Sequence, residues 1–115
     1  MGRRYRKIDM GIFDLFRRKD INEGLVQFKN TNGAILVDVR EKDEYRSGHI
    51  PGSKNIPLST LNIIEKQVKD KKTPLYIYCL SGSRSAQATR MLVKMGYEIV
   101  NDIGGISGYT GKIEY

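Results

Sequence analysis

The chain has 115 residues, of which 39% are hydrophobic and 29% charged, with a formal net charge of +7. This length suits one domain with one hydrophobic core, and the composition excludes intrinsic disorder. Residues 1–20 hold seven Lys or Arg against three Asp, while the other 95 residues hold thirteen against ten acids. Most of the excess charge therefore lies in a basic N-terminal extension, residues 1–19, ahead of a nearly balanced domain, residues 20–115.

The composition also bears on partners and compartment. We expect no nucleic-acid partner, although RNA or a membrane surface remains an alternative for the basic extension. Met10 resembles a natural start, which would make residues 1–9 an addition. Charged residues interrupt the only candidate apolar segment near the N-terminus, so we expect neither a signal peptide nor a membrane span. A single cysteine excludes an intramolecular disulfide, and no Cys or His pair has metal-ligand spacing, so a reducing cytoplasm without a metal is expected.

The first half of the chain alternates helix and strand signals. Asp20, with Glu23 three residues later, predicts the start of a helix that reaches Lys29. Residues 34–39 form a continuous apolar run with one acid, typical of a buried parallel strand. A short helix at residues 42–46 and a short strand at residues 53–56 follow.

The second half repeats this alternation. Ser59 is expected to cap a helix that runs to residue 70, with Leu61, Ile64 and Val68 on its inner face. A second buried strand is predicted at residues 74–79, a helix at 84–95 and a strand at 97–100. Strands that alternate with helices in this way predict an α/β fold with three layers, in which helices cover both faces of a central, mainly parallel sheet.

The only cysteine, Cys79, lies where the second buried strand ends and the longest helix begins. Ligand sites of open α/β sheets lie beyond the carboxyl ends of the strands. Gly82 lets the intervening loop close tightly, the helix start offers N–H groups, and Arg84 adds a positive charge. These features stabilise an anion at the sulfur, and the thiolate is the nucleophilic form of cysteine. The alternative is a small buried residue without chemistry.

Four ordered signatures resemble the single-domain rhodaneses, which are sulfurtransferases. They are residues 36–40 with Glu44 and Tyr45, residues 48–57, residues 79–85, and Gly104-Gly105-Ile106. The resemblance covers about residues 20–115 and implies a rhodanese-like three-layer α/β/α fold. It also implies a catalytic Cys79 and an anion-binding loop made of Leu80, Ser81, Gly82, Ser83, Arg84 and Ser85.

The resemblance further implies a thiosulfate sulfurtransferase that works through a Cys79 persulfide and needs no cofactor. Thiosulfate or a persulfide would be the donor, and a thiol or a protein cysteine the acceptor. The alternative is a persulfide carrier or interaction module that receives sulfur from a partner enzyme. The expected oligomeric state is a monomer or a weak dimer.

Details of the loop bear on the reaction class and on the donor. Four residues lie between Cys79 and Arg84, as in sulfurtransferases, whereas the related dual-specificity phosphatases and arsenate reductases have five. Leu80 departs from the polar or basic residue that many members have there, which makes thiosulfate a weaker candidate donor. Tyr109 is near the position where the family usually has a Trp, and it is expected to have the same packing role.

Other polar residues are expected to support the loop. Asp38, inside a buried strand, needs hydrogen bonds to loop amides or to an arginine. Arg40 is expected to reach Glu44, and His49 to hold a rigid turn and not to act as a general base. Direct binding of substrate by Asp38 or Arg40 remains an alternative. Tyr76 and Tyr78 are expected to belong to the core.

Overall fold

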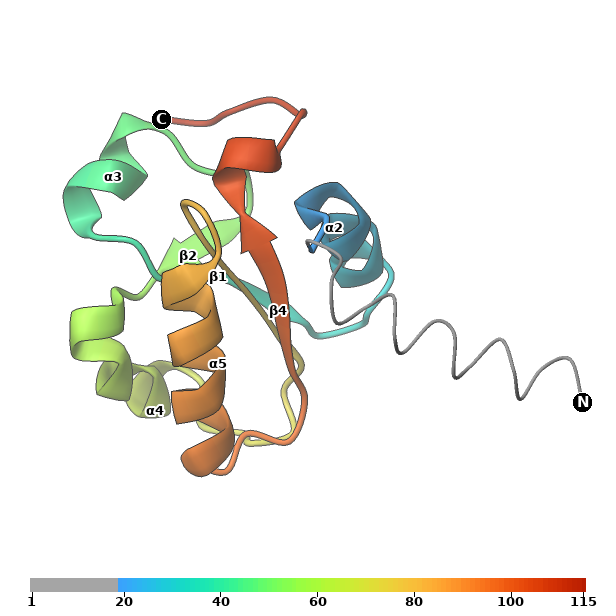
Figure 1. The fold of residues 1–115 in the computed structure, drawn as a ribbon. Helices are drawn as coiled ribbons and strands as arrows, with labels where there is room; N and C mark the ends of the chain where they lie inside the picture. Colours follow the sequence, from blue (N-terminus) through green and yellow to red (C-terminus); the bar gives the residue numbers. More distant parts are fainter. Residues whose placement is uncertain (1–18) are drawn as a thin grey trace, which may run out of the picture.

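The computed structural model describes residues 19–115. Its centre is a four-stranded sheet made of β1 (Ile35–Asp38), β2 (Ser53–Asn55), β3 (Leu75–Cys79) and β4 (Val100–Gly105). The strand order is β2-β1-β3-β4 and every pair is parallel (Figure 1). The predicted α/β class and parallel sheet are thus confirmed. The candidate start at Met10 and residues 1–18 of the predicted extension lie outside the described residues.

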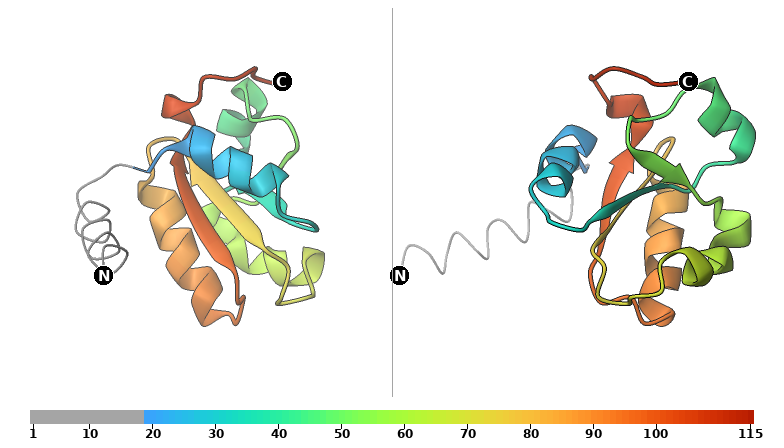
Figure 2. Two further views of the ribbon diagram at one scale, coloured as in Figure 1. Left: turned by 90° about the vertical axis from the view of Figure 1, so that its right-hand side faces the viewer. Right: turned by 180° about the vertical axis from the view of Figure 1, so that it is seen from behind.

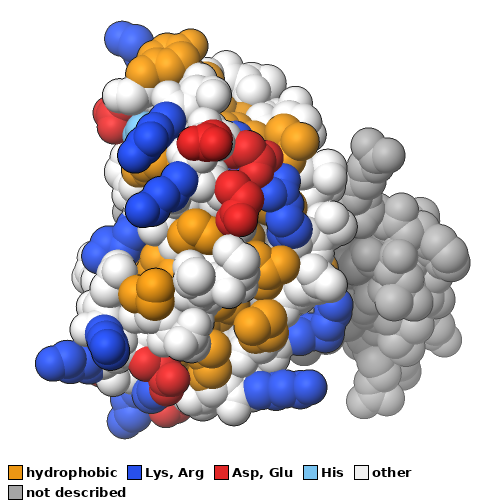
Figure 3. Space-filling model, turned by 90° about the vertical axis from the view of Figure 1, so that its left-hand side faces the viewer, with side chains coloured by type: hydrophobic (Ala, Val, Ile, Leu, Met, Phe, Trp, Pro, Cys, Tyr) orange, Lys and Arg blue, Asp and Glu red, His pale blue; other side chains and the backbone are white. Residues whose placement is uncertain are grey.

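Helices cover both faces of the sheet, as Figures 1 and 2 show. On one face lies α2 (Ile21–Lys29), whose start is capped by the Asp20 carboxylate, which accepts a hydrogen bond from the Asn22 N–H. On the other face lie α5 (Ser83–Lys94), η1 (Leu58–Ile63) and α4 (Ile64–Gln67). The short helix α3 (Lys42–Ser47) joins β1 to β2, and the 3-10 turn η2 (Ile106–Gly108) follows β4. The face of the molecule on the α3 side carries both basic and acidic side chains (Figure 3). The three layers match the sequence prediction.

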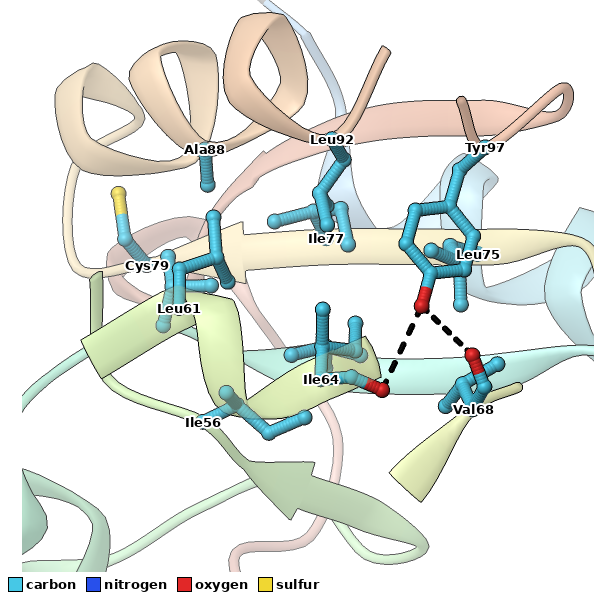
Figure 4. Close-up of a cluster of buried hydrophobic side chains, with 12 residues drawn as sticks. Ile56, Leu61, Ile64, Val68, Leu75, Ile77, Cys79, Ala88, Leu92 and Tyr97 are labelled. Atoms are coloured by element: carbon cyan, nitrogen blue, oxygen red, sulfur yellow. Dashed lines mark hydrogen bonds between the residues drawn. The ribbon is translucent and has the colours of Figure 1, made fainter. Parts of the chain in front are cut away.

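Strand side chains alternate between two hydrophobic clusters. On the α5 face, Val37 and Ile77 pack with the inner residues of η1, α4 and α5, and Cys79 belongs to this cluster (Figure 4). On the α2 face, Leu36, Tyr76 and Tyr78 pack with the inner residues of α2. Both tyrosines are therefore core residues, as expected. The clusters hold the sheet rigid beneath the carboxyl ends of its strands.

The helix predicted at residues 59–70 is wrong in extent and start. Pro57 caps the 3-10 helix η1, Thr60 leaves helical geometry at φ −129° and ψ 34°, and α4 ends at Gln67. Ser59 is not the cap; its hydroxyl lies 3.3 Å from a Glu41 carboxylate oxygen. Leu61, Ile64 and Val68 are buried as predicted, because three inward side chains can be spaced correctly on two short helical pieces.

The strand predicted at residues 97–100 is also wrong, because β4 begins only at Val100 and continues to Gly105. Tyr97 is buried, and its hydroxyl donates to the Val68 carbonyl at 2.6 Å. Its backbone N–H donates to the Leu92 carbonyl at 3.1 Å and so is not part of a strand ladder. The β4 segment pairs with the whole length of β3 across a register shift. Within residues 19–115 no helix combines the length and apolar character needed to cross a membrane.

Candidate active site

Cys79 is the last residue of β3 and is 1% exposed. In Figure 4 its sulfur points toward α5, beside Ala88. The Gly82 N–H donates to Sγ across an N···S distance of 3.0 Å. This contact places a backbone N–H dipole at the sulfur of Cys79.

The loop from Leu80 to Gly82 connects β3 to α5 in three residues. Gly82 has φ +108°, a conformation that side chains disfavour, so this position requires glycine. The first hydrogen bond of the helix runs from Ala86 N–H to the Gly82 carbonyl at 3.2 Å. The N–H groups of Ser83, Arg84 and Ser85 therefore have no acceptor within the helix, and they lie at its positive end.

Ser85 is fully buried, and its hydroxyl lies between the sulfur and the loop. The hydroxyl donates to the Gly82 carbonyl at 3.0 Å, and Cys79 Sγ is 3.6 Å from Oγ. The Gly104 carbonyl is 3.5 Å from the same oxygen. One serine thus ties together the thiol, the loop and the end of β4.

The end of β4 closes against the loop. The Ser107 N–H donates to the Leu80 carbonyl at 3.1 Å. A Cβ on Gly105 would lie 2.3 Å from that same carbonyl oxygen, and Gly104 has φ +100°. Gly105 is therefore needed because the Leu80 carbonyl lies too close for a side chain, and Gly104 is needed for its backbone conformation. The sequence showed the two glycines but not what they approach.

Arg84, in the first turn of α5, makes a two-pronged ion pair with Glu44 of α3. Nη1 lies 2.7 Å from Oε1 and Nη2 lies 2.9 Å from Oε2. The hydrogen bond from Arg84 is the main reason why the pKa of Glu44 falls to about 2. The pKa of Arg84 is raised, first by Glu44 and to a smaller extent by the nearby Cys79.

This pair corrects one expectation, because Arg40 is bound elsewhere. Arg40 Nη2 donates to an Asp38 carboxylate oxygen and to the Gly48 carbonyl, each at 2.7 Å. Asp38 also accepts from the Arg40 backbone N–H at 2.9 Å. Asp38 is 0% and Arg40 5% exposed, so the two form a buried ion pair that holds the segment after α3. Arg40 does not pair with Glu44, because its guanidinium is already bound by Asp38 and by the Gly48 carbonyl.

His49 is held in the turn that follows α3. Its ring stacks on Tyr45 with centroids 3.7 Å apart, and Nδ1 lies 2.8 Å from the Tyr45 carbonyl oxygen. Nε2 lies 3.4 Å from Glu114 Oε1, and the two residues also pair through their backbones. Neither ring nitrogen is hydrogen-bonded to Cys79. The contact with Glu114 could not be read from the sequence, because it joins distant parts of the chain.

Tyr78 connects this turn to β3. Its hydroxyl accepts from the Ile50 N–H at 3.1 Å and lies 3.0 Å from the Ser53 hydroxyl. Burial raises the pKa of Tyr78, so the group stays neutral and can both donate and accept. Tyr78 thus has a positioning role in addition to the predicted core role. In the sequence, the only indication of this positioning role is the hydroxyl group that Tyr78 carries into the core.

The remaining loop residues face outward. Leu80 is 45% exposed, and Ser81 and Ser83 are exposed as well. Tyr109 packs against the cluster on the α2 face and donates to the Lys112 carbonyl at 2.9 Å. Among the described residues, no three Cys, His, Asp or Glu side chains are grouped to hold a metal ion.

Comparison with known proteins gives a consistent result. The chain matches the family model of the rhodanese-like domain over residues 22–112. It is 44% identical over 82 residues to the uncharacterized protein YqhL of Bacillus subtilis, covering 70% of this chain and 64% of that protein. Against the thiosulfate sulfurtransferase PspE of Escherichia coli it is 38% identical over 71 residues, covering 61% of this chain and 68% of PspE.

A carrier protein and a solved structure extend the comparison. The putative sulfur carrier protein YrkF of B. subtilis is 39% identical over 82 residues, covering 69% of this chain and 43% of YrkF. A solved rhodanese with anions from E. coli superposes with a TM-score of 0.66 at 33% identity, covering 70% of this chain and 96% of that one. The matched region spans less than two thirds of the length of YqhL and YrkF.

Proposed function

The chain belongs to the rhodanese-like domain family, and from this premise we propose that it is a sulfurtransferase that carries sulfur as a persulfide on Cys79. The observation that carries the proposal is the 3.0 Å contact between the Gly82 N–H and Cys79 Sγ at the start of α5. A backbone donor and a helix N-terminus at the sulfur favour both the thiolate and the persulfide anion over the neutral thiol. A reducing compartment such as the cytoplasm suits a thiol that must be regenerated.

The reaction divides into two sulfur transfers. The Cys79 thiolate attacks the outer sulfur of thiosulfate, an S–S bond forms, the donor S–S bond breaks, and sulfite leaves with the electron pair. A thiophilic acceptor, such as cyanide or a thiolate, then attacks the terminal sulfur of the persulfide and regenerates the Cys79 thiolate. Covalent catalysis of this kind replaces one difficult exchange with two easier ones. No cofactor takes part in either step.

The chain's own residues have separate tasks in this cycle. The N–H groups of residues 82–85 hold negative charge at the sulfur in both steps. Ser85 and the carbonyl of Leu80, which Ser107 holds, keep those donors in position. The buried pair of Asp38 and Arg40 anchors the segment that carries Glu44. His49 acts on the turn and does not serve as a base, because a thiolate stabilised by the loop needs none.

The direct test is thiocyanate formation from thiosulfate and cyanide by the full chain. We expect turnover that Cys79→Ser abolishes. As a matched control, Ser107→Ala should retain most of the activity, because the loop is held there by its backbone N–H and not by its hydroxyl. Turnover that persists in Cys79→Ser would refute the proposal.

A persulfide carrier is the second candidate, and one observation favours it. Leu80, next to Cys79, is 45% exposed, and the Arg84 charge is already paired with Glu44. The rim of the site therefore offers an apolar contact and little net charge to a small dianion. Such a rim suits a protein donor that delivers sulfur by contact.

The two candidates differ in the donor that they accept. We expect an enzyme to load sulfur from thiosulfate at a useful rate, whereas a carrier loads only from a persulfide-bearing protein such as a cysteine desulfurase. Leu80→Lys should raise the rate with thiosulfate if small anions are weak donors for lack of charge. An unchanged rate with both donors would remove Leu80 as the residue that separates them.

A further inference from the structure

Arg84 is the charged side chain that the sequence placed in the anion-binding loop, yet the structure pairs it with a carboxylate. Two of its N–H groups point at Glu44, at 2.7 and 2.9 Å. Both side chains are 32% exposed, so the pair lies at the rim and is neither deeply buried nor fully solvated. An anionic donor that approaches Cys79 therefore meets an ion pair of zero net charge.

Glu44 is itself held in place before it meets Arg84. Its Oε1 accepts from the Glu41 backbone N–H at 3.1 Å, as part of a capping box that starts α3. The carboxylate is thus fixed by its own helix and does not simply follow the arginine. The low pKa of Glu44, about 2, keeps it ionised at neutral pH. At neutral pH, Arg84 therefore faces an ionised carboxylate that is also held by its own helix.

We propose that Glu44 is a specificity-determining residue, which holds Arg84 away from dianionic donors and so favours low-molecular-weight alkyl persulfides over thiosulfate. This inference rests on the proposed function, because it concerns the donor of the Cys79 persulfide. Specificity is the difference between the affinities for two donors. By neutralising Arg84, Glu44 lowers the affinity for the dianion more than the affinity for the alkyl persulfide. Leu80, 45% exposed beside the sulfur, suits the alkyl part of such a donor.

Sulfur transfer from an alkyl persulfide to Cys79 needs no further reactant. The Cys79 thiolate attacks the terminal sulfur of an alkyl persulfide anion, the new S–S bond forms, and the alkyl thiolate leaves with the electron pair of the broken S–S bond, so two negative charges enter the reaction and two remain. The leaving group carries one negative charge, where thiosulfate would release sulfite with two. The N–H groups at the start of α5 hold the charge that remains on the Cys79 persulfide.

The test compares two donors in a set of variants of the full chain. Glu44→Gln keeps the shape of the side chain and removes its charge. Asp43→Asn makes the same charge change on the neighbouring residue of α3, which is exposed and outside the Arg84 pair. The readout is the rate of Cys79 persulfide formation, by mass, from thiosulfate and from cysteine persulfide, at low and at high salt.

In Glu44→Gln we expect the rate with thiosulfate to rise about fivefold at low salt, while the rate with cysteine persulfide changes less than about twofold. Asp43→Asn should alter neither rate by more than about twofold. The gain should disappear in Glu44→Gln combined with Arg84→Gln, because it depends on the released arginine. An unchanged ratio between the donors in Glu44→Gln would overturn the inference.

Other outcomes separate this inference from the proposed function. If the wild type gains a Cys79 persulfide from cysteine persulfide but the donor ratio is the same in all variants, only the role of Glu44 is wrong. If no variant, including the wild type, gains a persulfide from either donor, the proposed function fails and the inference fails with it. Equal loading of Glu44→Gln and wild type by cysteine persulfide also shows that the variant is folded.

Discussion

A Cβ atom placed on Gly105 would lie 2.3 Å from the carbonyl oxygen of Leu80. The end of β4 is therefore in direct contact with the loop that follows Cys79, and Ser107 fixes this contact by donating to the same oxygen. The contact sets the distance between β4 and the loop, and with it the position of the N–H groups around the sulfur. Gly105 thus acts on the site through packing.

Gly105→Ala should displace the loop and lower sulfur transfer by about tenfold or more, with a stability loss of about 1–3 kcal/mol from the steric overlap. Backbone strain does not contribute to this loss, because Gly105 has φ −121° and ψ 141°, which alanine adopts readily. Gly108→Ala is the matched control, since its nearest neighbour would be 4.0 Å away. Urea unfolding and thiocyanate formation measure the two effects, and equal behaviour of the two variants would contradict this role of Gly105.

Gly82→Ala tests backbone geometry in the loop and not packing. Gly82 has φ +108° with open space where a Cβ would be, so alanine should cost about 1–2 kcal/mol and turn the N–H away from the sulfur. Gly33→Ala is matched, because Gly33 has φ +74°, also has open space, and precedes β1, at the end of the strands opposite to Cys79. Both variants should lose similar stability, but only Gly82→Ala should lose activity. Activity loss in both would mean that stability, and not the loop, is responsible.

Arg40→Met removes one partner of a buried ion pair and leaves the Asp38 carboxylate, 0% exposed, without its guanidinium. We expect a loss of about 3–5 kcal/mol in the free energy of unfolding. Arg46→Met, in the exposed last turn of α3, should stay within about 0.5 kcal/mol of the wild type. Chemical denaturation compares the two. An exposed ion pair contributes at most about 1 kcal/mol to stability. A loss below about 1 kcal/mol for Arg40→Met would therefore show that the Asp38–Arg40 pair does not anchor the segment.

The Glu44 pair predicts a specific pH dependence of stability. The pKa of Glu44 is about 2 in the folded chain against an ordinary value of 4.5, so between these values the unfolded chain binds more protons. The stabilisation is complete above about pH 4.5 and is lost as the pH falls through about 2. Solvent screening limits it to about 1 kcal/mol.

Unfolding of wild type and Glu44→Gln at a series of pH values tests this dependence. The wild type should be more stable at pH 7, and the difference should shrink below about pH 4.5. Asp43→Asn should show no comparable convergence with the wild type in the same range. A difference between wild type and Glu44→Gln that is independent of pH would contradict the assignment of the pair.

The sequence predicted the position of Cys79 because the apolar run before it is continuous and the residues after it suit a helix start. The parts that were not predicted depend on contacts between distant residues. Glu44 and Arg84 are 40 positions apart, and nothing local indicates that Arg84 rather than Arg40 is the partner of Glu44. The sequence signals also did not reveal the Gly105 contact with Leu80.

The errors in the fold have a similar cause. The β4 strand contains Asn101, Asp102 and two glycines, so its sequence lacks the alternation or apolar run of a strand. Its conformation comes from pairing with β3, and the Asp102 carboxylate accepts the Gly104 N–H at 3.1 Å where the chain leaves extended geometry. In the segment after Pro57, apolar spacing correctly identified the buried residues, but it could not show the break at Thr60.

The central claim is that Cys79 holds the transferred sulfur, and the mass of the full chain tests it most directly. After incubation with thiosulfate or cysteine persulfide and removal of the donor, the wild type should gain the mass of one sulfur atom, located on the peptide that contains Cys79. Cyanide should remove that mass and release one thiocyanate per chain, and Cys79→Ser should gain nothing. A wild-type chain that remains a bare thiol with both small donors and also with a persulfide-loaded cysteine desulfurase would contradict the account, as would a Cys79→Ser variant that gains the same mass.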